Sequence, residues 1–171
     1  MTHYPAKAKY VFDTSPAVML LEKCQLRKQL LRFGENNALV APYRVSEEYA
    51  VGDSETTKPN LVLFREVFSP VFVEENRELL RYFHFDNSSG EYWVIAYALG
   101  HPDFICVIDE YFGRTISGYF NAKLTGTIGI LKRMKAENCL TLEDLDCIKN
   151  TIKKSRFYLS KDLLRELDQI T

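Results

Sequence analysis

A short apolar run that ends in two acids constrains the fold more than any other part of this chain. Residues 104–108 (FICVI) are all apolar and mostly β-branched, and Asp109 and Glu110 follow them directly. Such a run is typical of a strand that is buried on both faces of a parallel sheet. Ligands bind beyond the carboxyl ends of the strands in sheets of this kind. Asp109 is therefore either a site residue or a cap for the following helix.

Similar short apolar runs alternate with helical patterns along the chain. The run 9–12 (KYVF) ends in DTSP at 13–16, where proline after a natural cap predicts a helix that continues to Leu31, followed by a turn at 34–37. Further strands are expected at 38–41, 71–73, 104–108 and 122–125. Further helices are expected at 42–50, 61–68, 75–83, 91–99, 111–120, 127–136 and 141–154, with a loop at 52–60 and a last helix capped by Ser160. The alternation predicts the α/β class, as a three-layer α/β/α fold with a central, mainly parallel sheet.

Length and composition predict one soluble domain. The 171 residues fit a single domain, and 46% hydrophobic with 26% charged residues is ordinary for a globular protein. A formal net charge of −1 gives no overall field that would attract nucleic acid, so such contacts need local basic patches. The four cysteines form no CxxC pair, which predicts reduced thiols. We expect no membrane segment, no signal peptide and a cytoplasmic location.

Four acidic residues are predicted to converge at one edge of the sheet. Asp13 and Asp109 each end a strand, and parallel strands place them on the same edge. Helices can bring Glu48 and Glu91 over that edge. Converging carboxylates repel one another and are costly to desolvate unless a cation neutralises them. Oxygen ligands of this kind suit Mg²⁺ or Mn²⁺.

Five motifs in the same order resemble those of PIN-domain nucleases, and most closely the small PIN-like proteins related to the VapC-type toxins of toxin–antitoxin pairs. They are VFDTS at 11–15, APYRVSEEY at 41–49, SGEYWVIAYAL at 89–99, VIDEYFGR at 107–114 and LTGTIGILKRMKAENCL at 124–140. The resemblance covers nearly all of residues 1–171 and implies a single PIN-like domain, with 52–90 as a divergent or inserted segment.

The resemblance implies a metal-dependent ribonuclease that hydrolyses RNA phosphodiester bonds. It implies Asp13 and Asp109 as ligands of Mg²⁺ or Mn²⁺, Glu48 and Glu91 as further catalytic acids, and Ser15 and Arg114 as phosphate-binding residues. A metal ion of this kind lowers the pKa of a bound water and stabilises charge on the phosphate. The implied partners are the RNA substrate, an antitoxin protein and a second copy of the chain in a homodimer.

Structural readings compete with several of these roles. Glu91 follows Ser88 at the spacing of a capping box, so it could serve only as a helix cap. Arg114 could be surface decoration. Tyr111 and Phe112 stand at helical positions and are expected in the core, not as platforms for nucleic-acid bases.

Other functions are also open at this stage. Trp93 stands where many relatives carry a further acid, which favours a catalytically inactive PIN fold that binds RNA or serves in assembly. The strand-end aspartate in VFDTS is also compatible with a haloacid-dehalogenase phosphatase, but that family needs an aspartate where Ser15 stands. A response-regulator receiver would need an acidic pair after the first strand, which is also missing.

Overall fold

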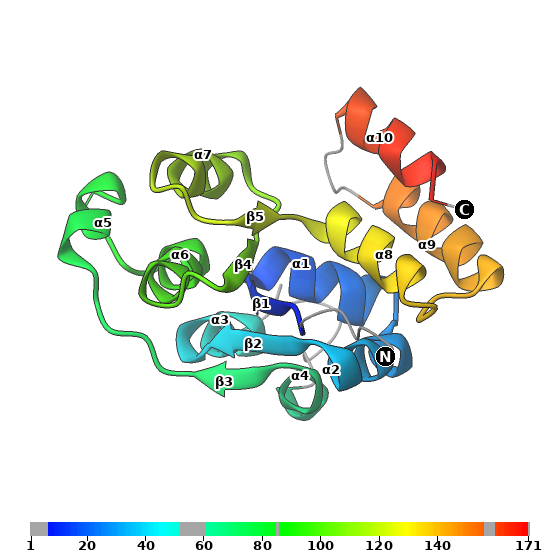
Figure 1. Ribbon diagram of the computed structural model, residues 1–171, viewed down its shortest axis with the longest axis horizontal. Coiled ribbons are helices and arrows are strands. Elements are labelled where there is room, and N and C mark those ends of the chain that lie inside the picture. Colours follow the sequence, from blue (N-terminus) through cyan, green and yellow to red (C-terminus); the bar gives the residue numbers. More distant parts are fainter. Residues whose placement is uncertain (1–6, 52–60, 85, 156–159, 171) are drawn as a thin grey trace, which may run out of the picture.

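Five parallel strands form the central sheet within the described part of the computed structural model, which comprises residues 7–51, 61–84, 86–155 and 160–170. The strands are β1 (Lys9–Phe12), β2 (Ala38–Pro42), β3 (Ser69–Val71), β4 (Phe104–Val107) and β5 (Leu124–Thr125). Their order across the sheet is β3-β2-β1-β4-β5 (Figure 1). β1 and β4 are therefore neighbours at the centre, with Phe12 opposite Val107. The predicted α/β class and parallel sheet are confirmed.

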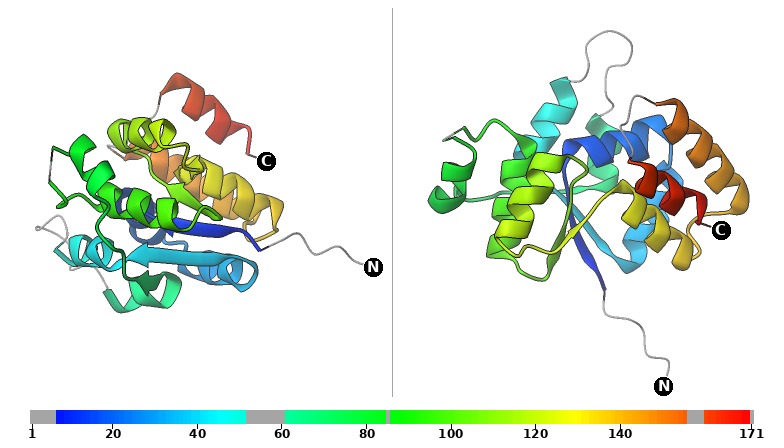
Figure 2. Two further views of the ribbon diagram at one scale, coloured as in Figure 1. Left: turned by 60° about the vertical axis from the view of Figure 1, so that its left-hand side comes forward. Right: turned by 90° about the horizontal axis from the view of Figure 1, so that it is seen from above.

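Helices cover both faces of this sheet, which makes the three layers that the sequence predicts. They are α1 (Thr14–Val18), the π-helical turn η1 (Met19–Lys23), α2 (Arg27–Asn36), α3 (Tyr43–Val51), α4 (Leu61–Val67), α5 (Arg77–Tyr82), α6 (Gly90–Gly100), α7 (Tyr111–Tyr119), α8 (Thr127–Ala136), α9 (Leu142–Lys154) and α10 (Lys161–Asp168). Seen from above, α6 and α7 lie on one side of the strands and α2, α8 and α9 on the other (Figure 2).

The first predicted helix is wrong as a continuous element. The backbone φ of Gln25 is 54°, a left-handed conformation that ends the helical segment before α2 begins. The Leu26 N–H donates to the carbonyl of Leu20 at 3.0 Å, a long return bond that is typical of such helix ends. Cys24 and Leu26, on either side of Gln25, are both buried. The apolar spacing of the sequence therefore continues through Gln25 and gives no sign that the helix ends there.

Other boundaries also differ from the predictions. The expected turn at 34–37 is wrong because α2 continues to Asn36. β3 lies at 69–71 instead of 71–73 and includes Pro70, which an edge strand tolerates. The caps near the end of the chain are confirmed: Thr141 and Asp144 form a capping box, and Ser160 accepts from the Leu163 N–H. The loop expected at 52–60 lies outside the described residues.

α6 is the helix that packs most deeply in the core. Seven consecutive residues, Tyr92 to Ala98, are buried. A helix that is apolar on all sides is stable only inside a protein, and α6 accordingly contacts β1, β2, β4, α3 and α7. This packing fixes the start of α6, where Glu91 lies.

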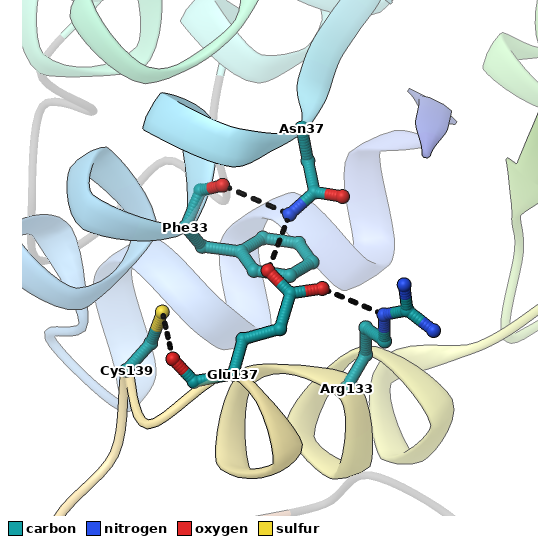
Figure 3. A network of polar contacts seen from close by, with 5 residues as sticks. All are labelled: Phe33, Asn37, Arg133, Glu137 and Cys139. Carbon is teal, nitrogen blue, oxygen red and sulfur yellow. Dashed lines mark hydrogen bonds and ion pairs between the residues drawn. The ribbon is translucent and has the colours of Figure 1, made fainter. Parts of the chain in front are cut away.

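A satisfied polar network closes the amino-terminal edge of the sheet, just before β2 (Figure 3). The side-chain amide of Asn37, which is 4% exposed, donates to the Phe33 carbonyl at 3.0 Å and to Glu137 Oε2 at 2.8 Å. Glu137 Oε1 accepts from Arg133 Nε at 2.6 Å. The network joins the end of α2 to the end of α8. Because each buried polar group in it has a partner, we assign it a structural role.

The four cysteines are unpaired thiols, and Cys24, Cys106 and Cys139 are buried while Cys147 is exposed. No helix in the described residues is long and apolar enough to span a membrane.

Candidate active site

Asp13 lies at the carboxyl edge of the sheet, directly after β1. Its backbone N–H donates to the Val107 carbonyl at 3.1 Å, which continues the pairing of β1 with β4 to the end of the strand. Asp13 is the N-cap residue of α1, yet its side chain makes no capping hydrogen bond. The residue is only 3% exposed. The fold therefore holds a carboxylate at this edge that is not used to cap the helix.

Glu48, on α3, converges with Asp13 beside the first residue of α6. Thr14 Oγ1 donates to Glu48 Oε2 at 2.9 Å and orients this carboxylate. A Cβ atom added at Gly90 would lie 2.6 Å from Glu48 Oε2 and 2.7 Å from Asp13 Oδ1. The two carboxylates thus face the same point, and only glycine leaves room for both. In the sequence Gly90 marks only the end of a turn, so sequence reasoning missed this close approach.

Glu91 is held by Ser89, and the alternative of a capping box between Ser88 and Glu91 is not formed. Ser89 is the N-cap residue of α6 and makes no side-chain capping bond. Its hydroxyl instead donates to Glu91 Oε2 at 2.9 Å. A Cβ at Gly113 of α7 would lie 3.2 Å from Glu91 Cγ, so the first turn of α7 packs closely on this side chain. Burial raises the pKa of Glu91, the Ser89 hydrogen bond opposes this, and Glu110 and Glu48 add to the rise.

Asp109, after β4, does not cap the helix that follows it, because the N-cap residue of α7 is Glu110. Asp109 instead accepts two hydrogen bonds from Thr127, the first residue of α8: from its backbone N–H at 2.8 Å and from its hydroxyl at 2.6 Å. A Cβ at Gly126 would come within 2.6 Å of Asp109 Oδ1. Sequence reasoning missed Thr127 and Gly126, although both lie in the motif LTGTIG.

Arg114 lies beside Asp109. Its Nη1 donates to the Ile108 carbonyl at 2.8 Å and to the Thr125 carbonyl at 3.4 Å. Burial raises the pKa of Asp109, while the Thr127 hydrogen bonds and the Arg114 charge oppose that rise. The backbone at the end of β4 thus orients the Arg114 guanidinium. Both of these bonds use Nη1, and the other two nitrogens of the guanidinium carry further N–H donors.

Burial and neighbouring acids both disfavour the ionised form of Asp13. Burial raises the pKa of this carboxyl to about 8, and Glu91, Glu48 and Asp109 push it in the same direction; the Thr14 backbone N–H opposes them. All three charged groups that act on Asp13 most strongly are acids. A cation placed at this edge would remove that penalty.

The donor set suits a hydrated cation better than a fully protein-bound one. Across the described ranges, no group of three or more His, Cys, Asp or Glu side chains is arranged to hold a metal ion. Mg²⁺ is commonly bound through only one or two carboxylates, with waters and phosphates completing its shell. Among the residues that the structure describes, no cation pairs with the buried Asp13 carboxylate, and each Asp109 oxygen keeps a lone pair beyond its Thr127 bond. Oxygen-only donors in this number fit such an ion.

A cleft of about 1130 Å³ opens beside Glu48. Thr14 and Ser15 of α1 line one part of it, and Lys23 and Arg44 supply cationic groups. Ser15 is therefore on the surface that a ligand at Glu48 would meet. Arg114 does not line this cleft. The structure brings Asp13, Glu48 and Ser15 together and places Arg114 with Asp109.

The expected burial of Tyr111 and Phe112 is wrong, and Trp93 makes a structural contact. Tyr111 and Phe112 are not in the core: they are 84% and 45% exposed. Trp93 is 9% exposed, and its indole N–H donates to the Asn87 carbonyl at 2.7 Å. Trp93 thus supports the segment that precedes α6, which is a role that an acid at this position could not fill in the same way.

Gly90→Ala tests the close approach of the carboxylates. The added methyl group would push Glu48 away from Asp13, so we expect a loss of about 1–3 kcal/mol in the free energy of unfolding and a smaller stabilisation by Mg²⁺. Gly100→Ala is the matched control at the other end of α6, where a Cβ meets nothing within 4 Å. Urea unfolding with and without Mg²⁺ measures both. The close approach of Asp13 and Glu48 at Gly90 would be contradicted if both variants had the same free energy of unfolding and the same stabilisation by Mg²⁺.

Asp13→Asn tests the buried charge through its pH dependence. The pKa of Asp13 is raised from 3.8 to about 8, so between these values the folded protein holds a proton that the unfolded chain has released. The free energy of unfolding of the wild type in EDTA should therefore fall as pH rises through this window, with a slope of about 1.4 kcal/mol for each pH step of one. Asp13→Asn cannot ionise, so its stability should fall less. Parallel curves for the two proteins would reject the assignment.

Comparison with known proteins assigns the family. A family model described as a PIN domain matches residues 9–170, which is nearly the whole chain. No curated protein and no solved structure matches. PIN domains are in general nucleases that act on nucleic acid, typically with divalent metal ions. The chain belongs to the PIN-domain family.

Proposed function

We propose that this protein is a Mg²⁺- or Mn²⁺-dependent ribonuclease that hydrolyses RNA phosphodiester bonds. The observation that carries the proposal is Asp13, a buried carboxylate whose strongest charged neighbours are acids. A protein gains no stability from such an arrangement. It does gain a site for a cation, which is what phosphodiester hydrolysis requires at a carboxylate cluster.

Asp13 and Asp109 would hold the ion, which lowers the pKa of a bound water and stabilises charge on the phosphate. The protein supplies the positions of these groups: β1 fixes Asp13 through its backbone, and Thr127 fixes Asp109 through two hydrogen bonds. Fixed ligands need no reorganisation when the substrate arrives.

Glu91 is the best candidate for the general base. Burial raises its pKa, and a base works best when its pKa lies close to the working pH. Ser89 orients one of its oxygens and leaves the other for a proton. Glu48, oriented by Thr14, would position a water or the ion on the side of the cleft.

Phosphate contacts are proposed on the two flanks of the acids. Ser15 offers a hydroxyl in the cleft beside Glu48, where Lys23 and Arg44 also lie. Arg114 offers its guanidinium beside Asp109. Both groups can donate to phosphate oxygens, and guanidinium does so with the geometry of a fork.

A second candidate is a PIN fold that binds RNA without cleaving it. Trp93, which stands where many PIN-domain relatives carry a further acid, favours this alternative. The convergence of Asp13 and Glu48 at Gly90 opposes it, because a binding module has no use for such repulsion. The toxin role, the antitoxin and the homodimer stay predictions from the family resemblance.

Glu91→Gln and Glu48→Gln test the catalytic assignment. Each change keeps the shape of the side chain and removes its charge, so Mg²⁺-dependent cleavage of labelled RNA should fall by roughly 10²–10⁴-fold while the fold is kept. Glu66→Gln is the matched control, since Glu66 pairs with Arg27 on the surface and does not line the cleft beside Glu48. Equal activity of all three variants would reject the assignment. A wild type that binds RNA but cleaves none with either ion would support the binding module instead.

A further inference from the structure

α7 gathers exposed aromatic side chains at the rim of the candidate active site. Five large aromatic side chains are exposed among the residues that the structure describes, and three of them are on this one helix: Tyr111 at 84%, Phe112 at 45% and Tyr119 at 66%. The other two, Tyr43 and Phe72, lie at the β3 side of the sheet. Single exposed aromatics are common, but a cluster on one element indicates a binding surface.

This cluster begins at the catalytic edge. Tyr111 is the first residue of α7 and follows Asp109 by two positions. Gly113, in the same turn, packs against Glu91 on the inner side of the helix. Side chains on a helix tilt toward its amino terminus, so Tyr111 leans toward the edge where the carboxylates lie. A nucleic-acid substrate that extends from the carboxylates toward α7 would contact Tyr111 first.

Two of the three rings are held in place by aromatic neighbours on or next to α5. Phe112 packs edge-to-face on Phe83, with ring centroids 5.2 Å apart, and Tyr119 contacts Tyr82 at 4.9 Å. Rings that are fixed before binding lose little conformational entropy when a flat ligand stacks on them. Figure 1 shows α5 and α7 on the same side of the molecule, next to α6.

The charge of this segment fits phosphate. Residues 111–136 contain no Asp or Glu but five basic residues, although the whole chain has a net charge of −1. Lys132 and Arg133 are paired with Glu166 and Glu137. Arg114 is three residues after Tyr111, and side chains at this spacing are neighbours on a helix surface. α7 thus carries aromatic rings and no acid, and the Arg114 guanidinium lies where the helix meets the end of β4.

Gly118 leaves the outer face of α7 open beside the exposed rings. A Cβ at Gly118 would meet no atom of the described residues within 4 Å, so packing among these residues does not require glycine there. Glycine inside a helix is nevertheless unfavourable relative to alanine. Its lack of a side chain leaves the helix surface flat between Tyr111 and Tyr119, which allows a ligand to approach the backbone closely.

We propose that the outer face of α7, with Tyr111 as its first contact, is a stacking platform for the bases of a single-stranded nucleic acid on one side of the scissile phosphate. The proposal rests on the proposed nuclease function for its direction, but its chemistry stands on this surface. Stacking on aromatic rings tolerates any base and needs unpaired bases, so the platform would select single strands over duplexes.

Binding to the full-length protein in EDTA tests this without cleavage. Fluorescence anisotropy with a labelled single-stranded oligoribonucleotide should show a Kd that is roughly 5- to 100-fold weaker for Tyr111→Ala than for the wild type. Tyr111→Phe keeps the ring and should bind as the wild type does. Phe72→Ala is the control. Phe72 is 85% exposed, but it follows β3 at one edge of the sheet, whereas α7 connects β4 and β5 at the other edge. Binding of the matching duplex should change little in every variant.

Gly118→Leu separates loss of binding from loss of folding. Leucine favours helix over glycine, so the Tm should rise while the new side chain obstructs the platform and weakens binding of the single strand. The proposal is overturned if Tyr111→Ala or Gly118→Leu binds the single strand as tightly as Phe72→Ala does. It is also overturned if Tyr111→Phe is as weak as Tyr111→Ala, or if these changes turn a dimer into a monomer in light scattering, which would make the face an interface between copies.

Binding and cleavage results together separate failure of the stacking platform from failure of the proposed nuclease function. A protein that cleaves RNA with unchanged binding in Tyr111→Ala keeps the nuclease function and loses the platform. A protein that binds single strands through Tyr111 but never cleaves keeps the platform and loses the nuclease.

Discussion

The burial of the Asp13 carboxylate among other acids is the constraint on which the rest of the structure depends. An ionised group removed from water is costly, and like charges nearby increase that cost. The protein carries this cost at Asp13. Several neighbouring groups hold the Asp13 and Glu48 carboxylates in place. The backbone of β4 binds the Asp13 N–H, Thr14 turns Glu48 toward it, and Gly90 leaves the space in which both carboxylates meet.

The two edges of the sheet carry polar clusters of different kinds. At the amino-terminal edge, Asn37, Glu137 and Arg133 satisfy one another, and the acid has a cationic partner. At the carboxyl edge, Asp13 has acids as its strongest charged neighbours. The buried residues of α6 and the central strands position the elements that carry these acids. We infer that a cation and the phosphate of a substrate complete this edge.

Much of this arrangement could be predicted from the sequence because strand ends are easy to recognise. The run 104–108 and the run 9–12 both end in aspartate, and parallel pairing of β1 with β4 brings those ends together. The supporting groups could not be predicted. Thr127 is distant from Asp109 in the chain, and a glycine such as Gly90 looks the same in a turn as beside a carboxylate.

Other differences have equally local causes. The left-handed residue that breaks the first helix is Gln25, whose identity gives no warning of a turn. The exposure of Tyr111 was missed because aromatic residues at helical spacing are usually buried, and only the position of α7 at the rim of the sheet shows otherwise.

Anomalous diffraction from crystals of the full-length protein grown with Mn²⁺ tests the central claim most directly. A cation that neutralises this edge should give a peak between Asp13 and Asp109, roughly 2.0–2.6 Å from an Asp13 oxygen, with waters around it. A structure that contains Mn²⁺ elsewhere, with none at Asp13 and with the Asp13 and Asp109 carboxylates turned apart, would contradict the account.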